Sequence, residues 1–275
     1  MIGLGAIGGS LAWQARLAGV PRVVGFSPSR TDGVEALRAS AVTELAESPR
    51  QAMLGAELVV LASPARATLE LIGLLAPALE VGATLTDVCS VKGSVLRRAA
   101  AEGLGDRFAG AHPLAGTHAS GFAAARPDRL RGCVVYVCET GAPGGDHAAR
   151  RVMGFWERVL EAHPVLIGAE AHDRQLAWTS HLPQAVASAL AKTLADRGLA
   201  GVSFGTGARD TTRLAASSPD MWIDILLYNR EAIVESLAAA ETGLAELRAL
   251  VAASDEDGLR RYLTAAQRFR EGLDR

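Results

Sequence analysis

A glycine-rich segment at the start of the chain, Gly3-Leu-Gly5-Ala-Ile-Gly8, constrains the fold more than any other feature. In a strand-to-helix turn of this kind, the first glycine permits a tight turn and the second lets the backbone approach a pyrophosphate. The third allows the following helix to pack closely on the sheet. The segment therefore predicts a dinucleotide at a helix N-terminus, with contacts from Gly3, Gly5, Ala6, Ile7 and Gly8.

Short apolar runs alternate with helical patterns along the first part of the chain. The runs lie at residues 22–26, 58–62, 84–87, 108–111, 133–138 and 165–167. This alternation predicts an α/β fold with a parallel sheet, and a Rossmann-like nucleotide-binding domain over residues 1–168. Only Met1 and Ile2 precede Gly3, so the first strand is nearly missing. A translation start further upstream is the favoured explanation, and a shortened strand with weaker cofactor binding is the alternative.

Beyond Ala169 the sequence has no strand pattern, and Ala, Leu, Glu and Arg recur at helical spacing. These patterns cover residues 170–197, 221–251 and 255–271. They predict an all-helical domain over residues 169–275, with a kink at Pro183. The stretches 182–194 and 223–237 are apolar on more than one face, which favours burial against a second copy in a homodimer.

The composition narrows the class of ligand. The chain of 275 residues has a formal net charge of -2 and no basic block, which argues against a nucleic-acid partner and favours a small-molecule substrate. The three cysteines form no CxxC pair, so no disulfide framework or metal site is expected. No apolar run approaches a membrane span, and no signal peptide precedes the fold, so we expect a cytoplasmic protein with no membrane partner.

The end of the second predicted strand bears on the choice between NAD and NADP. A carboxylate at this position would bind the ribose hydroxyls of NAD, but Ser27 stands there. Ser29 and Arg30 follow and could bind a ribose phosphate, so NADP is favoured; a solvated arginine in a turn is the alternative. Ser63 and Ser90, each after a later strand, are further expected cofactor contacts.

Four further motifs occur in order along the chain. They are Asp87-Val-Cys-Ser90-Val-Lys92-Gly93; Gly110-Ala-His112-Pro113-Leu-Ala-Gly116-Thr117; His172-Asp173 with Ser180-His181-Leu182-Pro183; and Thr212-Arg213-Leu-Ala with Met221-Trp222-x-Asp224-Ile225. With them the sequence resembles the prephenate/arogenate dehydrogenase family over nearly its whole length. The resemblance implies the NAD(P)-dependent oxidative decarboxylation of prephenate to 4-hydroxyphenylpyruvate, a step of tyrosine biosynthesis.

The resemblance also implies roles for single residues. His112 is the expected base, since an imidazole titrates near working pH, and Ser90 is expected to orient it. Arg213 is expected to hold a substrate carboxylate in a bidentate contact, with an interdomain salt bridge as the alternative. The other expected substrate contacts are Thr117, His172, His181, Gln184 and Trp222; for Thr117 a loop hydroxyl, and for Trp222 a buried structural ring, is the alternative.

Gln184 departs from the family pattern. Many prephenate-using relatives have a histidine directly after the proline, whereas Gln184 is neutral at every pH. Arogenate, which carries an added ammonium group, is therefore an alternative substrate. Two more distant alternatives are a hydroxyacid or imine reductase with the same two-domain plan, and a nucleotide-binding dimer that has lost catalysis.

Overall fold

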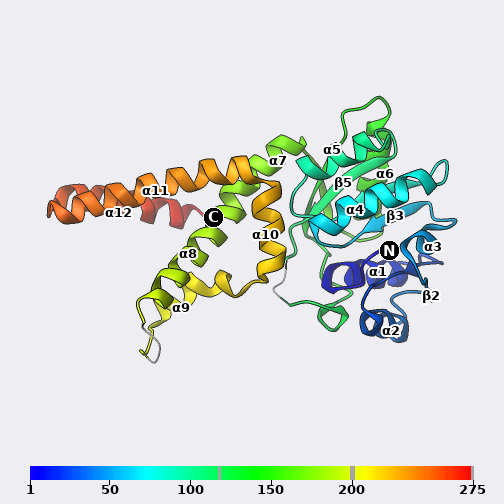
Figure 1. The fold of residues 1–275 in the computed structure, drawn as a ribbon, viewed down its shortest axis with the longest axis horizontal. Helices are drawn as coiled ribbons and strands as arrows, with labels where there is room; N and C mark the ends of the chain where they lie inside the picture. Colours follow the sequence, from blue (N-terminus) through cyan, green and yellow to red (C-terminus); the bar gives the residue numbers. More distant parts are fainter. Residues whose placement is uncertain (117–118, 199–201, 274–275) are drawn as a thin grey trace.

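The computed structural model describes residues 1–116, 119–198 and 202–273, and it consists of an α/β part and a helical part (Figure 1). Every strand of the described residues belongs to the α/β part. The helical part begins at α7 (Ala169–Leu176) and extends away from the sheet. Thr117 lies outside the described residues, so its predicted ligand contact stays a prediction.

The main sheet has the strand order β3-β4-β5-β6-β7. Its strands are β3 (Leu58–Leu61), β4 (Thr84–Asp87), β5 (Phe108–Pro113), β6 (Val134–Glu139) and β7 (His163–Leu166). β3, β4 and β5 are parallel, whereas β6 runs antiparallel to β5 and parallel to β7. The predicted parallel sheet is thus confirmed for β3, β4 and β5 and wrong for β6, which runs antiparallel to β5. Between β5 and β6 the described residues form only the short helix η2 (Phe122–Ala124), whereas a parallel neighbour is usually reached through a crossover α-helix.

The first three residues join the main sheet to a smaller one. The smaller sheet pairs β1 (Val24–Gly25) with β2 (Glu44–Leu45) in parallel. Ile2 forms isolated parallel bridges to Phe26 and to Leu61. The Ile2 N–H donates to the Val60 carbonyl at 2.8 Å, and the Gly3 N–H donates to the Phe26 carbonyl at 2.8 Å. Residues 1–3 therefore take the place of a central strand beside β3.

Helices cover both faces of the main sheet and pack on the smaller sheet. They are α1 (Ala6–Leu17), α2 (Arg30–Arg38), α3 (Pro49–Met53), α4 (Ala65–Leu75) with η1 (Ala76–Ala78), α5 (Gly93–Ala101) and α6 (Gly145–Arg158). Successive strand residues point to opposite faces, so on β5 Phe108 joins the apolar cluster of α4 and α5, while Ala109 joins that of α6. The buried Trp156 of α6 fills the second cluster.

The helical part confirms the predicted all-helical pattern among its described residues. It contains α7, a π-helical turn (Ala177–His181), α8 (Leu182–Asp196), α9 (Thr206–Thr212), η4 (Arg213–Ala216), α10 (Pro219–Tyr228), α11 (Arg230–Ala252) and α12 (Glu256–Gly272). The wide turn directly precedes Pro183, whose ring and missing N–H disturb regular α-helical bonding. No helix of the described ranges is both long and apolar enough to cross a membrane.

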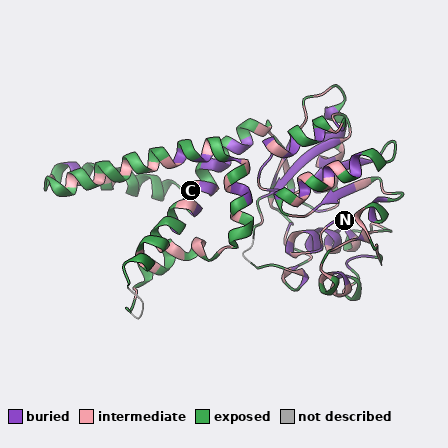
Figure 2. Ribbon diagram, in the orientation of Figure 1, coloured by how far each residue is buried: buried purple, intermediate pink, exposed green. Residues whose placement is uncertain are grey.

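Burial differs sharply between the two parts. Buried residues fill the sheet and the helices around it, whereas α11 and α12 are mostly exposed (Figure 2). Their exposed side chains include large apolar ones: Val234, Leu244, Val251, Leu263 and Phe269.

Candidate active site

His112 lies near the end of β5, at the edge where β4 also ends. Asp87, the last residue of β4, pairs with Gly110, so β5 continues past its neighbour and carries His112 beyond it. In open α/β sheets the carboxyl ends of the strands form the ligand-binding edge. The position of His112 is therefore the one expected for a residue that meets a bound ligand.

A chain of hydrogen bonds runs from His112 into the helical part. His112 Nδ1 lies 2.9 Å from His172 Nε2, and His172 Nδ1 lies 2.8 Å from Asp173 Oδ1. His172 and Asp173 come from α7, so the chain links β5 of the α/β part to the first helix of the helical part. We refer to it as the His112–His172–Asp173 chain.

The carboxylate of Asp173 is held by the start of α5. Its Oδ1 accepts the backbone N–H of Lys92 at 2.8 Å, and its Oδ2 accepts that of Gly93 at 2.8 Å. An N-terminal helix turn is a favourable place for an anion, because its N–H groups lack partners within the helix. Burial raises the pKa of Asp173, but the bonds from His172, Lys92 and Gly93 outweigh this effect and the pKa lies below its usual value.

The ionised Asp173 sets the protons of both imidazoles. His172 donates its Nδ1 hydrogen to the carboxylate, so its Nε2 accepts the Nδ1 hydrogen of His112. The lone pair of His112 then lies on Nε2, which has no partner among the described residues. Burial, followed by the charges of His172, Lys92 and His181, holds the pKa of His112 well below its usual value. The ring is thus a neutral base whose free nitrogen is Nε2.

This arrangement changes the expected role of His172. Its side chain is fully buried, and both ring nitrogens are bonded within the protein. No ring nitrogen of His172 remains for a substrate, so we correct the expected substrate contact to a contact with His112.

Lys92 and Asp87 form a completely buried ion pair beneath this chain. Lys92 Nζ donates to Asp87 Oδ2, and the same oxygen accepts the Cys89 N–H at 2.8 Å. These contacts fix the segment between β4 and α5, which carries the half-buried Ser90. A buried ion pair needs such additional hydrogen bonds, because they offset the free-energy cost of removing both charges from water.

A second group of polar side chains surrounds His181. Asn229 Nδ2 lies 3.1 Å from His181 Nδ1 and donates to the Asp173 carbonyl at 2.7 Å. The rings of His181 and Trp222 meet edge-to-face, with centroids 5.9 Å apart. The buried atoms His181 Nε2 and Trp222 Nε1 have no hydrogen-bond partner among the described residues. The structure thus brings the predicted residues His181 and Trp222 together.

The glycine-rich segment has the shape of a cradle for a dinucleotide. A Cβ at Gly3 would lie 2.2 Å from the Ala62 oxygen, and one at Gly8 would lie 2.0 Å from the Gly3 oxygen. At Gly5, in contrast, a Cβ would meet nothing within 4 Å. Gly5 is also the N-cap of α1 and offers no side-chain cap, which leaves the first N–H groups of that helix, including Ala6 and Ile7, for a ligand. The residues present fit a pyrophosphate.

Among the other predicted cofactor residues, the serines Ser27, Ser29 and Ser63 are hydrogen-bonded within the protein, whereas Arg30 is exposed. Ser29 is the N-cap of α2 and accepts the Asp32 N–H at 3.2 Å, while Ser27 Oγ accepts the Ser29 N–H at 3.2 Å. Arg30 follows as the exposed first residue of α2. Ser63 Oγ lies 2.8 Å from Thr68 Oγ1.

Gln184 and Arg213 lie on neighbouring elements. Gln184, buried on α8, donates from Nε2 to the Leu214 carbonyl at 2.9 Å and to Ser188 Oγ at 3.3 Å. Both amide hydrogens of Gln184 are therefore engaged within the helical part, and its expected contact with the substrate stays a prediction. The bond to Leu214 anchors η4, whose first residue is Arg213.

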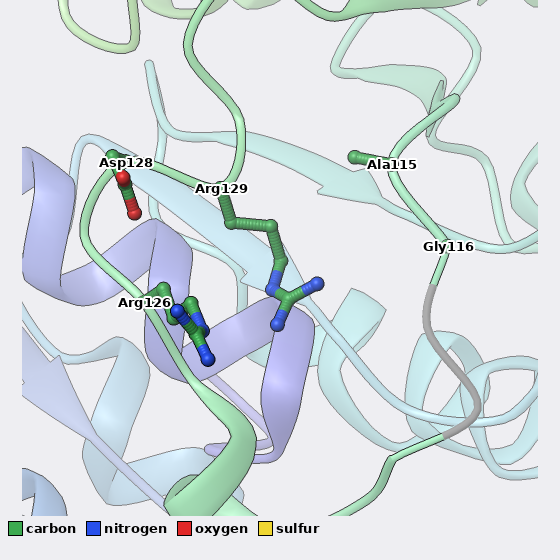
Figure 3. Close-up of a pocket in the computed structure, with 5 residues that line it drawn as sticks. All are labelled: Ala115, Gly116, Arg126, Asp128 and Arg129. Carbon is green, nitrogen blue, oxygen red and sulfur yellow. The ribbon is translucent and has the colours of Figure 1, made fainter.

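A hollow of about 410 Å³ lies beside the segment that follows β5 (Figure 3). Ala115, Gly116, Arg126, Asp128 and Arg129 line it. The Arg126 N–H donates to Ser10 Oγ on α1 at 2.9 Å, so the hollow adjoins the helix that follows the glycine segment. Its two guanidinium groups favour an anionic ligand group. No group of His, Cys, Asp or Glu among the described residues is arranged to hold a metal ion.

Two protein-family models match the chain. The nucleotide-binding domain of prephenate dehydrogenase matches residues 11–165, and the dimerization domain of prephenate dehydrogenase matches residues 168–265. The chain belongs to the prephenate dehydrogenase family. The resemblance seen in the four motifs and the predicted fold class are thereby confirmed, and the dimerization model supports the expected homodimer.

Individual members of the prephenate dehydrogenase family are similar over the whole chain. Prephenate dehydrogenase of Bacillus subtilis is 32% identical over 286 residues, which cover 99% of this chain and 75% of that protein. The crystal structure of prephenate dehydrogenase from A. aeolicus in complex with hydroxyphenyl propionate and NAD+ is 30% identical, with a TM-score of 0.89, and covers 99% of this chain and 96% of that one. Synechocystis arogenate dehydrogenase is 28% identical with a TM-score of 0.80, covering 99% and 98%.

The sequence analysis assigned no role to Asp173 or to Asn229. Asp173 had a signal, because it follows His172 directly in one of the motifs. Asn229 had no such signal, since its partners lie 48 and 56 residues away along the chain.

Asp224 joins the two parts of the fold: its carboxylate accepts the Arg66 N–H at 3.0 Å at the start of α4.

Proposed function

We propose that the chain catalyses the NAD(P)-dependent oxidative decarboxylation of prephenate to 4-hydroxyphenylpyruvate, as a cytoplasmic homodimer. In this proposal residues 1–168 bind the cofactor, and residues 169–275 complete the substrate site and form the dimer. The observation that carries it is the neutral His112, held by His172 and Asp173 at the ligand-binding edge of the sheet. Membership of the family supports the same reaction.

His112 acts on the ring hydroxyl of the substrate. Its Nε2 accepts the hydroxyl proton, while the carbon that bears the hydroxyl gives up a hydride and the ring carboxylate leaves as carbon dioxide. The bound nicotinamide supplies the hydride acceptor. The electron pair of the broken carbon–carbon bond completes the aromatic ring as a phenolate, and His112 returns the proton to this oxygen to give the phenol of the product. Formation of the aromatic ring makes the reaction effectively irreversible. The His112 imidazolium is stabilised through His172 by the Asp173 carboxylate.

Other predicted residues bind the substrate and the cofactor. Arg213 holds a substrate carboxylate, and Ser90 orients His112 and helps to position the nicotinamide. His181 and Trp222 contribute N–H donors, because both have a buried ring nitrogen without a partner in the part of the chain that the structure describes. At the cofactor, Ser27, Ser29 and Arg30 favour NADP over NAD, since no carboxylate stands where one would repel a ribose phosphate.

Arogenate is the second candidate substrate. The observation that favours it is Gln184, which supplies no positive charge near η4, where prephenate relatives often carry a histidine. A neutral amide leaves the side-chain ammonium of arogenate without a repelling cation. We favour prephenate.

Initial-rate formation of reduced nicotinamide tests the proposal. Purified protein is assayed with prephenate and with arogenate, each with NAD and with NADP. We expect activity with prephenate and NADP to exceed that of the other three pairs. Faster turnover of arogenate would transfer the proposal to that substrate. No activity with any pair, in protein shown to be folded by circular dichroism, would overturn the dehydrogenase function.

A further inference from the structure

Asn229 occupies the junction between two helices of the helical part. It is the C-cap of α10 and the N-cap of α11, and its side chain is buried. Its amide nitrogen has two partners, the backbone carbonyl of Asp173 at 2.7 Å and His181 Nδ1 at 3.1 Å. It therefore contacts the end of the His112–His172–Asp173 chain and a predicted substrate residue at the same time.

The orientation of the Asn229 amide follows from these partners. A carbonyl oxygen only accepts hydrogen bonds, so the atom of Asn229 that faces the Asp173 carbonyl must be the nitrogen. One of its hydrogens goes to this carbonyl, and the second reaches His181 Nδ1. Asn229 thus offers His181 a donor and requires a lone pair on Nδ1.

From this geometry we infer that Asn229 is a positioning residue that holds His181 in the tautomer with its hydrogen on Nε2. Nδ1 accepts from Asn229, so the single ring hydrogen of the neutral imidazole lies on Nε2. Burial lowers the pKa of His181 to about 4, which agrees with a neutral ring. Asp173, whose charge opposes this shift, and His172 are the titratable groups that act on it.

The fixed tautomer explains a pair of unpartnered donors. The Nε2–H of His181 and the Nε1–H of Trp222 are both buried and bond to none of the described residues, and their rings are in edge-to-face contact. Buried N–H groups without a partner are rare and costly, and here two occur on adjacent rings. Their natural partner is an acceptor-only oxygen of a ligand, such as a carboxylate or a carbonyl. With the other tautomer, His181 would present a lone pair to that oxygen and repel it.

The ligand contact rests on the proposed function, whereas the tautomer does not. Nitrogen-15 NMR of histidine-labelled full-length protein at neutral pH measures the tautomer directly. We expect His181, assigned by its loss in His181→Leu, to show a pyrrole-like Nε2 and a pyridine-like Nδ1. A pyrrole-like Nδ1 in the unaltered protein would overturn the inference, whatever its enzymatic activity.

Substitution of Asn229 tests whether this residue fixes the tautomer of His181. Asn229→Asp keeps the shape but removes the donor, and we expect the ring hydrogen of His181 to move to Nδ1. Asn229→Ala, a second variant in case the aspartate prevents folding, should give a mixture of tautomers. The control Ser236→Ala removes a buried hydroxyl on the same helix, which bonds the Ile233 carbonyl at 3.0 Å, and should leave the tautomer unchanged. An unchanged tautomer in both Asn229 variants would refute the role of Asn229.

The kinetic consequence separates this inference from the proposed function. KM is measured with whichever substrate is active in the assay proposed above. Asn229→Asp should raise this KM about tenfold relative to Ser236→Ala, as expected for the loss of a hydrogen bond to a charged group. An altered tautomer with an unchanged KM would contradict the ligand contact of His181 and leave the tautomer assignment standing.

Discussion

The α/β part and the helical part bury their apolar residues to very different extents. The sheet and its flanking helices enclose contiguous apolar clusters, so this part has its own core. On α11 the only buried residues are Ile233 and Ser236, and on α12 only Gly258. A pair of helices with so little buried surface gains its stability from a further contact, and the dimerization model matches this region.

The active site depends on both parts, but in different ways. The α/β part contributes His112 and the N–H groups that hold Asp173, all on a rigid strand or helix end. The helical part contributes His172 and Asp173, which fix the protons of His112. The proposed base thus lies on the self-contained part, and the residues that fix its protons lie on the part that needs a partner.

The largest effect is expected at His112. His112→Asn removes the base, and kcat should fall about 10²- to 10⁴-fold, the contribution typical of general-base catalysis. KM should change little, because the proton is transferred only in the transition state. Steady-state kinetics measure both constants, with cofactor affinity from fluorescence titration as the control for folding. A kcat within a factor of three of the unaltered enzyme would exclude His112 as the base.

The second prediction concerns the exposed helices. The double variant Leu244→Glu with Leu263→Glu places charges on the exposed apolar side chains of α11 and α12, and should raise the dimer dissociation constant about a hundredfold. Val81→Glu, at a fully exposed residue of the α/β part, is the matched control and should leave the dimer intact. Light scattering over a dilution series measures the effect. Equal dissociation of the two proteins would mean that α11 and α12 do not carry the interface.

Arg213 lies in the helical part and tests whether this part binds substrate. Arg213→Ala should raise KM about tenfold or more through the loss of a charged hydrogen bond, with a smaller change in kcat. Arg209→Ala, one turn earlier on α9, provides a control arginine. If both variants behave alike, Arg213 has no special contact with the substrate.

Much of this comparison could be predicted from the sequence, but not all of it. The glycine segment, the strand pattern and His112 are local signals, and each is read from neighbouring residues. The direction of β6 depended on the absence of a crossover helix between β5 and β6 among the described residues, which periodicity alone did not reveal. Asn229 and the bond between Asp224 and Arg66 join residues far apart along the chain, so only the folded structure brings them together.

Arg30 gives a smaller effect within the α/β part. Arg30→Ala should weaken NADP binding about fivefold and NAD binding much less, because an exposed guanidinium contributes about 1 kcal/mol to a phosphate contact. Arg38→Ala, at the other end of the same helix, serves as the control. Isothermal titration with both cofactors measures the difference. An equal loss for NAD and NADP would remove the basis for favouring NADP.

The smallest expected effect is the pH dependence of the unaltered enzyme. Burial and nearby charges lower the pKa of His112, so the ring stays neutral as the pH falls from 7 to 6 and protonates only at lower pH. kcat/KM should therefore stay nearly constant over this interval, whereas an ordinary imidazole with a pKa near 6.5 would lose about threefold of its neutral form. The helical part enters this result through His172, whose proximity to His112 is the second cause of the lowered pKa. A threefold decline of kcat/KM between pH 7 and 6 would show that His112 titrates as an exposed histidine. It would also contradict an effect of His172, and so of the helical part, on the pKa of His112.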